Sequence, residues 1–329
     1  MGSTNDKSEY FIGVDLGGTK IYAGVFDPGL ALVGTTKLST KSDRGHAAVI
    51  ERLARCVRDA IDECDLSSKN IRAVGVGAPG TVDGETGRVV FAPNLGWQNV
   101  PLQKELQKQL EMPVFVGNDC TLGMLGVYAQ ELKAKPSHVI GIFIGTGIGG
   151  GLILNGEPYT GAGHAAGEVG HMVINMGGPK CACGNQGCLE AVASRTAIFR
   201  RVAAAVKDGQ KTILTDMLGD ELKDLRSGDL RKAIRRGDKL VERVVSDAAD
   251  CIGIAVGNLI NIFSPEIVVL GGGVIEALDD EMLPTISKIA RQHVLPGTEK
   301  SIEIISSKLG DHAGIVGAAV FARQSVKTL

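Results

Sequence analysis

Residues 11–26, FIGVDLGGTKIYAGVF, place two short apolar runs on either side of a glycine turn. The runs Phe11–Asp15 and Ile21–Phe26 are rich in the β-branched and aromatic side chains that are typical of strands. Asp27-Pro28-Gly29 follows the second run, and these residue types favour a turn. The segment therefore predicts a β-hairpin that continues into a third strand.

The same arrangement returns about 130 residues later in the chain, as it would in a duplicated domain. Residues 139–154, VIGIFIGTGIGGGLIL, again read as strand, glycine turn and strand, with strands expected over Val139–Ile144 and Leu152–Leu154. We therefore expect an α/β fold of two duplicated domains with a ligand cleft between them and one glycine turn on each wall of that cleft.

The segments between and after these copies mix helical and strand patterns. Apolar residues recur every three or four positions from Val49 to Cys64, which predicts a helix of about four turns. Strands are expected over 71–76, 114–116 and 267–270, a hairpin around 83–87, and helices over 238–263 and after His312. If the last helix packs back on the first domain, the domains comprise residues 10–132 plus 312–329 and residues 133–311.

Composition excludes several classes of protein. Apolar residues make up 44% and charged residues 22% of the 329 positions, which is typical of a folded globular chain. The net charge of −2 provides no general attraction for nucleic acid or an anionic membrane. The first ten residues lack the apolar core of an export signal, and the uncharged run 139–154 is shorter than the roughly 18 residues of a membrane span. We therefore expect a cytoplasmic protein with no nucleic-acid or membrane partner.

The turn Gly17-Gly18-Thr19-Lys20 resembles a phosphate-binding turn. Gly13 and Gly18 have the four-residue gap of a P-loop, but Thr19 precedes Lys20 and a strand follows in place of a helix. The helix N-terminus that holds phosphate in a P-loop is therefore missing. The turn either binds phosphate in another way or only closes the hairpin.

The second turn, Gly145-Thr146-Gly147, continues to Gly150 and has Glu168 about 20 residues further on, as in the dinucleotide-binding fingerprint. A dehydrogenase is therefore one alternative. The continuation 151–156 reads as a strand and a turn, whereas the fingerprint requires a crossover helix. Exposed backbone amides at such a turn still form a site for phosphate without a helix.

Two carboxylates stand at the ends of predicted strands. Asn118-Asp119 follows the strand 114–116, and loop residues at that end of a strand face the ligand crevice in α/β proteins. Asp119 is therefore a candidate catalytic carboxylate, or one of the pair caps the helix that begins near Cys120. Asp15 is a candidate for holding hydrated Mg²⁺, or it only forms a turn.

His171, Cys181, Cys183 and Cys188 form the strongest local signal in the sequence. Three thiolates and one imidazole complete a tetrahedral zinc set, and the glycines between them let a short loop fold around the ion. Because all four ligands come from the protein, the zinc is expected to be structural. The alternative is a set of reduced thiols with His171 paired elsewhere.

Two carboxylates flank this predicted zinc loop, since Glu168 is three residues before His171 and Glu190 two residues after Cys188. If zinc occupies one ring nitrogen of His171, the other is an N–H donor at neutral pH. Such an array suits a polyhydroxy ligand. Alternatively, Glu190 only supplies favourable charge at a helix start and Glu168 is a solvated loop acid.

Taken together, these motifs resemble those of the ROK family of bacterial sugar kinases and sugar-responsive repressors, over nearly the whole chain from Tyr10. The motifs that carry the resemblance are DLGGTK (15–20), Asn118-Asp119, Glu168 with His171, the cysteine loop with Glu190, and LGGG (270–273). The resemblance implies the actin-like ATPase fold, with two ribonuclease H-like domains, an active site between them and a homodimer.

The resemblance also implies a role for each matching residue. Asp119 would be the base for the sugar hydroxyl. The implied sugar ligands are Gly80, Asn94, Asn118, Asp119, Glu168, His171 and Glu190. The implied ATP and Mg²⁺ site comprises Asp15, Gly17, Gly18, Thr19, Lys20, Gly145, Thr146, Gly147, Gly271, Gly272 and Gly273.

The resemblance therefore predicts an ATP-dependent hexose kinase that phosphorylates the 6-hydroxyl group of a hexose, with glucose favoured. The same motifs fit N-acetylmannosamine or N-acetylglucosamine kinases, and polyphosphate could replace ATP. Family repressors carry a DNA-reading domain before the first strand, whereas here the first turn begins at residue 15. We therefore expect an enzyme and not a transcriptional regulator.

Overall fold

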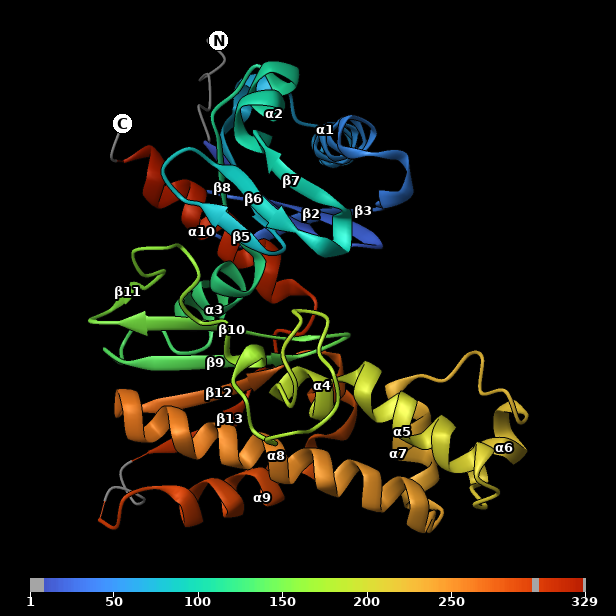
Figure 1. Ribbon diagram of the computed structural model, residues 1–329. Helices are drawn as coiled ribbons and strands as arrows, with labels where there is room; N and C mark the ends of the chain where they lie inside the picture. The colour runs from blue at the N-terminus through green and yellow to red at the C-terminus, as the bar shows by residue number, and fades with distance from the viewer. Residues whose placement is uncertain (1–8, 298–301, 328–329) are drawn as a thin grey trace. The chain divides into compact units, whose positions relative to one another are not determined.

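The computed structural model describes residues 9–297 and 302–327 (Figure 1). Residues 1–8 of the polar start and residues 328–329 of the expected first domain lie outside the described part. The chain divides into two compact units, Met1–Lys135 with Glu157–Ala166 and Asp311–Leu329, and Pro136–Gly156 with Gly167–Gly310. The expected boundaries placed residues 157–166 in the second domain, whereas their contacts group them with the first unit.

The first unit is built on a sheet of strand order β3-β2-β1-β4-β8. Its strands are β1 (Tyr10–Leu16), β2 (Lys20–Phe26), β3 (Leu32–Ser39), β4 (Ile71–Ala78) and β8 (Val114–Asn118). β1 pairs antiparallel with β2 and parallel with β4, and β4 pairs parallel with β8. The hairpin with a third strand is therefore confirmed.

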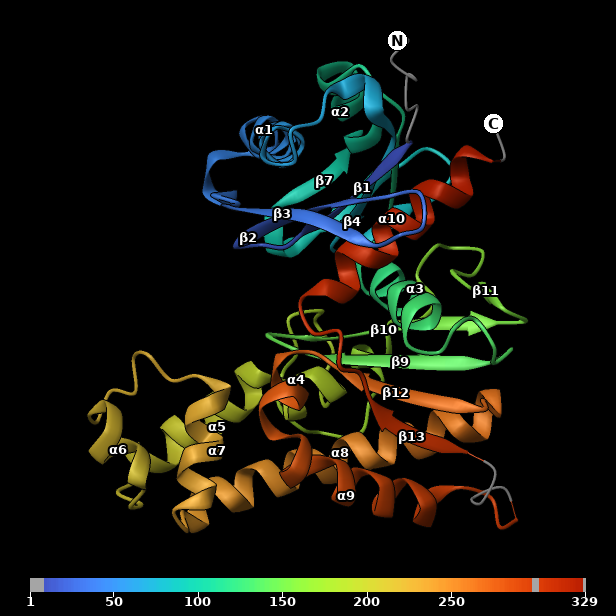
Figure 2. The same ribbon diagram turned by 180° about the vertical axis from the view of Figure 1, so that it is seen from behind.

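Helices cover both faces of this sheet (Figures 1 and 2). They are α1 (His46–Glu63), α2 (Leu102–Leu110), α3 (Asp119–Gln130) and α10 (His312–Val326), with short 3₁₀ turns η1 (Ser42–Arg44), η2 (Ser68–Asn70) and η3 (Pro93–Leu95). α1 packs on β2 and β3, while α10 packs on β1, β4 and α3. The apolar positions expected to line α1 are buried as the helical spacing predicts, and only Cys64 falls beyond the helix end. The last helix thus packs back on the first unit, as expected.

A second, smaller sheet in this unit has the order β5-β6-β7. Its strands are β5 (Thr81–Asp83), β6 (Arg88–Ala92) and β7 (Trp97–Val100). β5 and β6 pair antiparallel, which confirms the hairpin around residues 83–87. The segment 157–166 contains the short strand β11 (Glu157–Pro158), which is not part of this sheet.

The second unit repeats the central topology of the first, with the order β10-β9-β12-β13. Its strands are β9 (Val139–Ile144), β10 (Ile148–Leu154), β12 (Ile267–Gly271) and β13 (Glu303–Ser306). β9 pairs antiparallel with β10 and parallel with β12, which pairs parallel with β13. The same sequence of antiparallel and parallel pairs joins β2, β1, β4 and β8. The predicted duplication is therefore present in the topology.

One expectation in this unit is wrong. β10 begins at Ile148, so Gly149–Gly151 belong to the strand and not to the turn. A Cβ atom on Gly150 would lie 2.7 Å from the backbone oxygen of Gly167, so the close approach of another segment requires glycine within this strand.

The remaining elements of the second unit are mainly helical. They are η4 (Val169–His171), α4 (Leu189–Ala193), α5 (Arg195–Lys207), α6 (Ile213–Leu218), α7 (Ser227–Arg235), α8 (Lys239–Phe263) and α9 (Gly273–His293). α8 and α9 lie side by side, and α9 contacts β12 and β13 (Figure 1). Among the described helices, only α8 has the length and composition to cross a membrane, but 56% of its most apolar stretch is buried inside the protein. It also contacts α4, α5 and α7, as a core helix does.

Candidate active site and metal centre

The first glycine turn closes the β1–β2 hairpin. Gly17 N–H donates to the carbonyl oxygen of Lys20 at 2.9 Å, and the Thr40 hydroxyl donates to the Gly17 carbonyl at 2.7 Å. A Cβ atom on Gly18 would lie 3.3 Å from the backbone oxygen of Asn94. The structure therefore places the predicted sugar-side residue Asn94 against the predicted phosphate turn.

Asp15 lies at the end of β1, directly before this turn. Burial raises the pKa of its carboxyl group from 3.8 to about 6; the charge of Lys20 opposes this shift, while that of Asp311 adds to it. Lys20 Nζ lies 2.7 Å from Asp311 Oδ2, at the start of α10. Asp311 was not predicted from the sequence. It adds a second carboxylate beside the turn.

Asn118 and Asp119 stand where β8 ends and α3 begins. Asn118 caps the helix, because its side-chain oxygen accepts the Thr121 N–H at 2.9 Å. Its amide nitrogen donates to the Gly80 carbonyl at 3.0 Å and to Asp119 Oδ1 at 3.2 Å. Asp119 Oδ1 also accepts the Cys120 N–H at 2.8 Å. Asn118 therefore caps the helix, as the alternative interpretation held, while it also orients Asp119 and joins it to Gly80.

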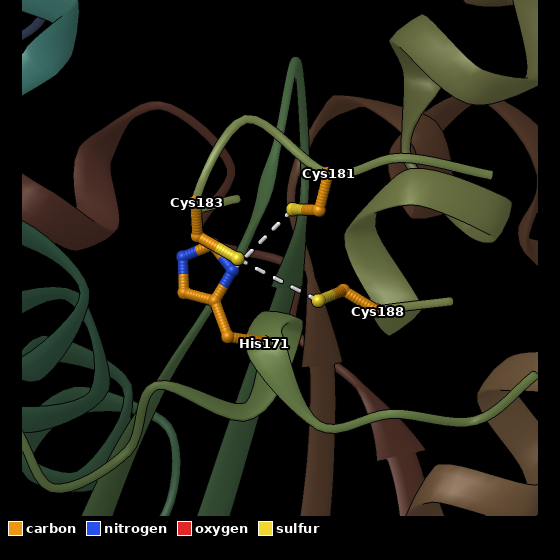
Figure 3. Close-up of side chains that lie close together, drawn as sticks. All are labelled: His171, Cys181, Cys183 and Cys188. Carbon is orange, nitrogen blue, oxygen red and sulfur yellow. Dashed lines mark hydrogen bonds between the residues drawn. The ribbon is translucent and has the colours of Figure 1, made fainter. Parts of the chain in front are cut away.

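The four predicted metal ligands converge in the second unit (Figure 3). One ligand atom from each of His171, Cys181, Cys183 and Cys188 lies within 4.8 Å of all the others. His171 Nδ1 is 3.7 Å from Cys181 Sγ, and Cys183 Sγ is 3.7 Å from Cys188 Sγ. Three sulfur atoms and one imidazole nitrogen at these separations suit a tetrahedral zinc ion.

Gly177, Gly184 and Gly187 of the loop that carries these ligands all have positive φ angles. Gly187 has a φ angle of 76°, and a Cβ atom there would lie 1.7 Å from the backbone oxygen of Asn175. Burial raises the pKa of the Cys188 thiol to about 12, and a bound metal cation would favour its thiolate form. The donor set and its burial therefore fit a structural metal.

The two carboxylates that flank the metal ligands make different contacts. Glu168 Oε2 lies 3.9 Å from His171 Nε2, on the ring nitrogen that does not face the sulfur atoms. Glu190 Oε2 accepts the Ile148 N–H at 3.0 Å, and Glu190 Oε1 lies 4.0 Å from Cys181 Sγ. Glu190 thus contacts both the second glycine turn and the metal cluster, a contact that the sequence did not predict.

The second turn is held by the start of α5 as well. Arg195 N–H donates to the Gly145 carbonyl at 3.0 Å, and the Thr196 hydroxyl donates to the Thr146 carbonyl at 2.7 Å. The Arg195 guanidinium group also donates to the Thr146 hydroxyl. Neither Arg195 nor Thr196 belongs to a motif that could have marked it in the sequence.

A cavity of about 550 Å³ adjoins this turn within the second unit. Its wall has an apolar part, from Phe199 and Leu225, and a cationic part, from Arg195 and Arg226. The full lining is Thr146, Arg195, Thr196, Phe199, Leu225, Arg226 and Ser227. Such a mixture suits a ligand that has both an apolar ring and anionic groups.

The predicted adenosine segment Gly271–Gly273 joins β12 to α9. Gly272 has a φ angle of 86° and caps α9, and a Cβ atom there would lie 2.6 Å from the Ile144 carbonyl oxygen. This position therefore requires glycine for two reasons, its backbone conformation and its contact with the end of β9.

Comparison with known proteins gives consistent matches over almost the whole chain. A glucokinase of Thermotoga maritima is 34% identical over 316 residues, which are 96% of this chain and 98% of that protein. A putative xylose repressor of Caldicellulosiruptor sp. is 30% identical over 306 residues, which are 93% of this chain and 76% of that protein.

The crystal structure of a Streptomyces griseus ROK glucokinase in complex with glucose and AMPPNP matches with a TM-score of 0.85 and 31% identity, covering 96% of this chain and 99% of that one. The shared fold is the actin-like ATPase fold that the family resemblance implies. The ROK family model matches residues 11–325. With motifs, topology and relatives in agreement, this chain belongs to the ROK family.

Proposed function

We propose that the protein is an ATP-dependent hexose kinase that transfers the γ-phosphoryl group of ATP to the 6-hydroxyl group of glucose. The observation that carries the proposal is the Asn118–Asp119 pair, in which one carboxylate is oriented by the neighbouring amide and by a backbone N–H. The likeness to glucokinases over nearly their whole length supports this choice. A regulator that only binds sugar has no need of such a base.

Asp119 acts as the base in this reaction. As the 6-hydroxyl oxygen bonds to the γ-phosphorus, the bond from phosphorus to the bridging oxygen of ADP breaks, and the hydroxyl proton passes to the Asp119 carboxylate. Because the transition state of phosphoryl transfer is loose, most of the rate enhancement comes from alignment and charge neutralisation.

The proposed sugar ligands are polar groups, and each unit has its own set. In the first unit these are Gly80, Asn94 and Asn118. Asn118 is hydrogen bonded to Gly80 and Asp119, and Asn94 lies against Gly18 of the first glycine turn. In the second unit they are Glu168, His171 and Glu190. The Glu168 carboxylate and the His171 Nε2 atom together offer an acceptor and a donor to vicinal hydroxyl groups.

The donor occupies the two glycine turns and the segment Gly271–Gly273. Lys20 supplies a positive charge for the phosphates, and Asp15 is the candidate ligand for Mg²⁺. Bound Mg²⁺ neutralises charge on the phosphate oxygens. The cavity beside Thr146 supports a nucleotide over inorganic polyphosphate, since Phe199 and Leu225 give an apolar surface for a base.

The metal centre has a structural role in this proposal. Zinc would be held by His171, Cys181, Cys183 and Cys188, with the imidazole bound through Nδ1. The Nε2 atom is then fixed as an N–H donor toward Glu168 and the sugar. We also propose a homodimer, which sedimentation equilibrium of the purified protein tests.

The function is tested by ADP release with ATP and Mg²⁺ across glucose, N-acetylglucosamine, N-acetylmannosamine and fructose, with a blank that lacks sugar. We expect the highest kcat/KM with glucose. Preference for an acetamido sugar would keep the kinase chemistry and change the substrate. An enzyme that releases no ADP with any of these sugars would contradict the proposed function. A parallel assay of sugar phosphate formed from polyphosphate would then test the alternative donor.

A further inference from the structure

The segment from Glu190 to Thr196 holds the second glycine turn on both sides. Glu190 accepts the Ile148 N–H, Arg195 donates to the Gly145 carbonyl, and Thr196 donates to the Thr146 carbonyl. These bonds hold the first two residues of the turn Gly145–Gly147 and the residue that directly follows it. The turn itself contributes one internal bond, from Gly145 N–H to the Gly147 carbonyl at 2.9 Å. Residues about 50 positions away in the chain therefore help to set its shape, together with the β9–β10 pairing that flanks it.

Glu190 lies against the turn so closely that no other side chain fits between them. A Cβ atom on Gly147 would lie 2.2 Å from Glu190 Oε2. At its other oxygen, Glu190 lies 4.0 Å from Cys181 Sγ, and Cys188 precedes it by two residues as the N-cap of α4. A single side chain therefore connects the metal cluster with the turn.

We propose that Glu190 and Thr196 are positioning residues for the phosphoryl donor, and that through Glu190 the metal cluster controls donor affinity. This inference rests on the proposed function, because it takes the turn Gly145–Gly147 as a donor site. Backbone amides bind phosphate only while they converge on it, so a turn that loses its external hydrogen bonds holds the donor less well. Glu190 uses Oε2 for this role, in addition to its predicted contact with the sugar.

Thr196→Val tests the proposal at a residue that is not among the proposed sugar ligands. Valine keeps the shape of the side chain and removes the hydroxyl that donates to Thr146. We expect the KM for ATP and the Kd for Mg²⁺–ADP to rise roughly 3- to 10-fold, the effect of one lost hydrogen bond, while the KM for the sugar stays unchanged. The matched control is Thr215→Val in α6, which removes a hydroxyl bond of the same kind, to the Thr212 carbonyl at 2.8 Å, away from the turn.

Two substitutions of Glu190 separate its role at the turn from its charge. Glu190→Gln keeps an oxygen that accepts the Ile148 N–H, so donor affinity should stay within about twofold of the wild type. Glu190→Ala removes the acceptor, so the Kd for Mg²⁺–ADP, measured by calorimetry without sugar, should rise. Hydrogen exchange at the Ile148 amide should accelerate in the alanine variant alone. If the Glu190 carboxylate served only the sugar, both variants would have a higher KM for the sugar and an unchanged Kd for Mg²⁺–ADP. That result would overturn the proposal.

Metal removal completes the test. Removal of the cluster metal by a chelator should weaken Mg²⁺–ADP binding in the wild type. The Kd is measured by calorimetry after the chelator has been removed and excess Mg²⁺ added. Metal removal should weaken binding little further in Glu190→Ala, because the connection is already lost. Equal additional losses in both proteins would overturn the role of Glu190. A wild-type protein that phosphorylates no sugar would contradict the proposed function, whereas an active enzyme whose Thr196→Val and Glu190→Ala variants bind Mg²⁺–ADP normally would contradict only the positioning.

Discussion

Lys20 and Asp311 form an ion pair with a separation of 2.7 Å although 291 positions separate them in the sequence. The pair joins the first glycine turn to the start of α10. Lys37 also reaches Asp311, at 3.4 Å, and lies over the Tyr22 ring, 4.2 Å from its centre. Asp311 thereby balances two cations beside the turn, and these pairs help to lower the pKa of its own carboxyl group. The charges of Lys20 and Asp311 also act on Asp15, which directly precedes the turn.

The raised pKa of Asp15 predicts a specific pH dependence of stability. Between pH 3.8 and about 6 the folded protein binds the Asp15 proton more tightly than the unfolded chain does. Unfolding therefore becomes easier as the pH rises through this window, and the ionised carboxylate costs about 3 kcal/mol above it. Asp15→Asn removes this cost. We expect the free energy of unfolding of the variant to exceed that of the wild type at pH 7 and this advantage to shrink toward pH 4.

Denaturant titrations at several pH values measure this difference. Glu51→Gln, at an exposed position of α1, controls for the loss of one negative charge from the same unit. An Asp15→Asn advantage that is the same at pH 4 and pH 7 would contradict a raised pKa.

Asp119→Asn is expected to abolish most of the turnover while sugar binding persists. The asparagine keeps an oxygen for the Cys120 N–H and the Asn118 amide, but it cannot accept the proton of the sugar hydroxyl. Loss of a general base lowers kcat by roughly 10²- to 10⁴-fold. Steady-state kinetics give kcat, and calorimetry gives the Kd for glucose. A variant with near-normal kcat would remove Asp119 from the role of base.

Most of the fold can be predicted from the sequence because it follows from local patterns of apolar residues and glycines. The hairpin 11–26 and its copy at 139–154 follow from short apolar runs that glycines interrupt, and periodic spacing predicts α1 and α8. The low strand propensity of glycine favours a turn at Gly149–Gly151. Their place in β10 depends on contacts with a distant segment, which no local pattern records.

Part of the candidate site is likewise predictable from local sequence patterns, and part is not. The metal cluster is predictable because three of its ligands lie within eight residues and the fourth ten residues before them. The contacts of Arg195 and Thr196 with Thr146 cannot be predicted from the sequence, because they join residues 49 and 50 positions apart that belong to no motif. Glu190 was found by its place after Cys188, but its bond to Ile148 depends on how α4 lies against β10.

Cys183→Ser is expected to weaken metal binding and, through His171, sugar binding. Cys183 is the exposed member of the cluster, so its replacement disturbs the core least. With the metal lost, the His171 ring is no longer fixed through Nδ1, and Nε2 no longer has a defined protonation state toward Glu168. Elemental analysis measures the metal content, and calorimetry the Kd for glucose. Cys251→Ser, outside the cluster, is the control. Wild-type protein that is fully active with no bound zinc would contradict the coupling.

Close packing of α10 on α3 makes Gly317 highly sensitive to added volume. A Cβ atom there would lie 1.6 Å from the Leu122 backbone oxygen, and one on Gly126 would lie 2.3 Å from that of Ala313. Because both obstacles are backbone atoms, the two helices must separate to accommodate a methyl group. We expect Gly317→Ala to lower the free energy of unfolding by about 3 kcal/mol, the upper part of the range for overpacked cores. Thermal and denaturant unfolding measure this change.

Gly163→Ala, in the same unit with no atom within 4 Å of the added Cβ, should leave stability nearly unchanged. Equal stability of the two variants would mean that the helices pack less closely than these distances require.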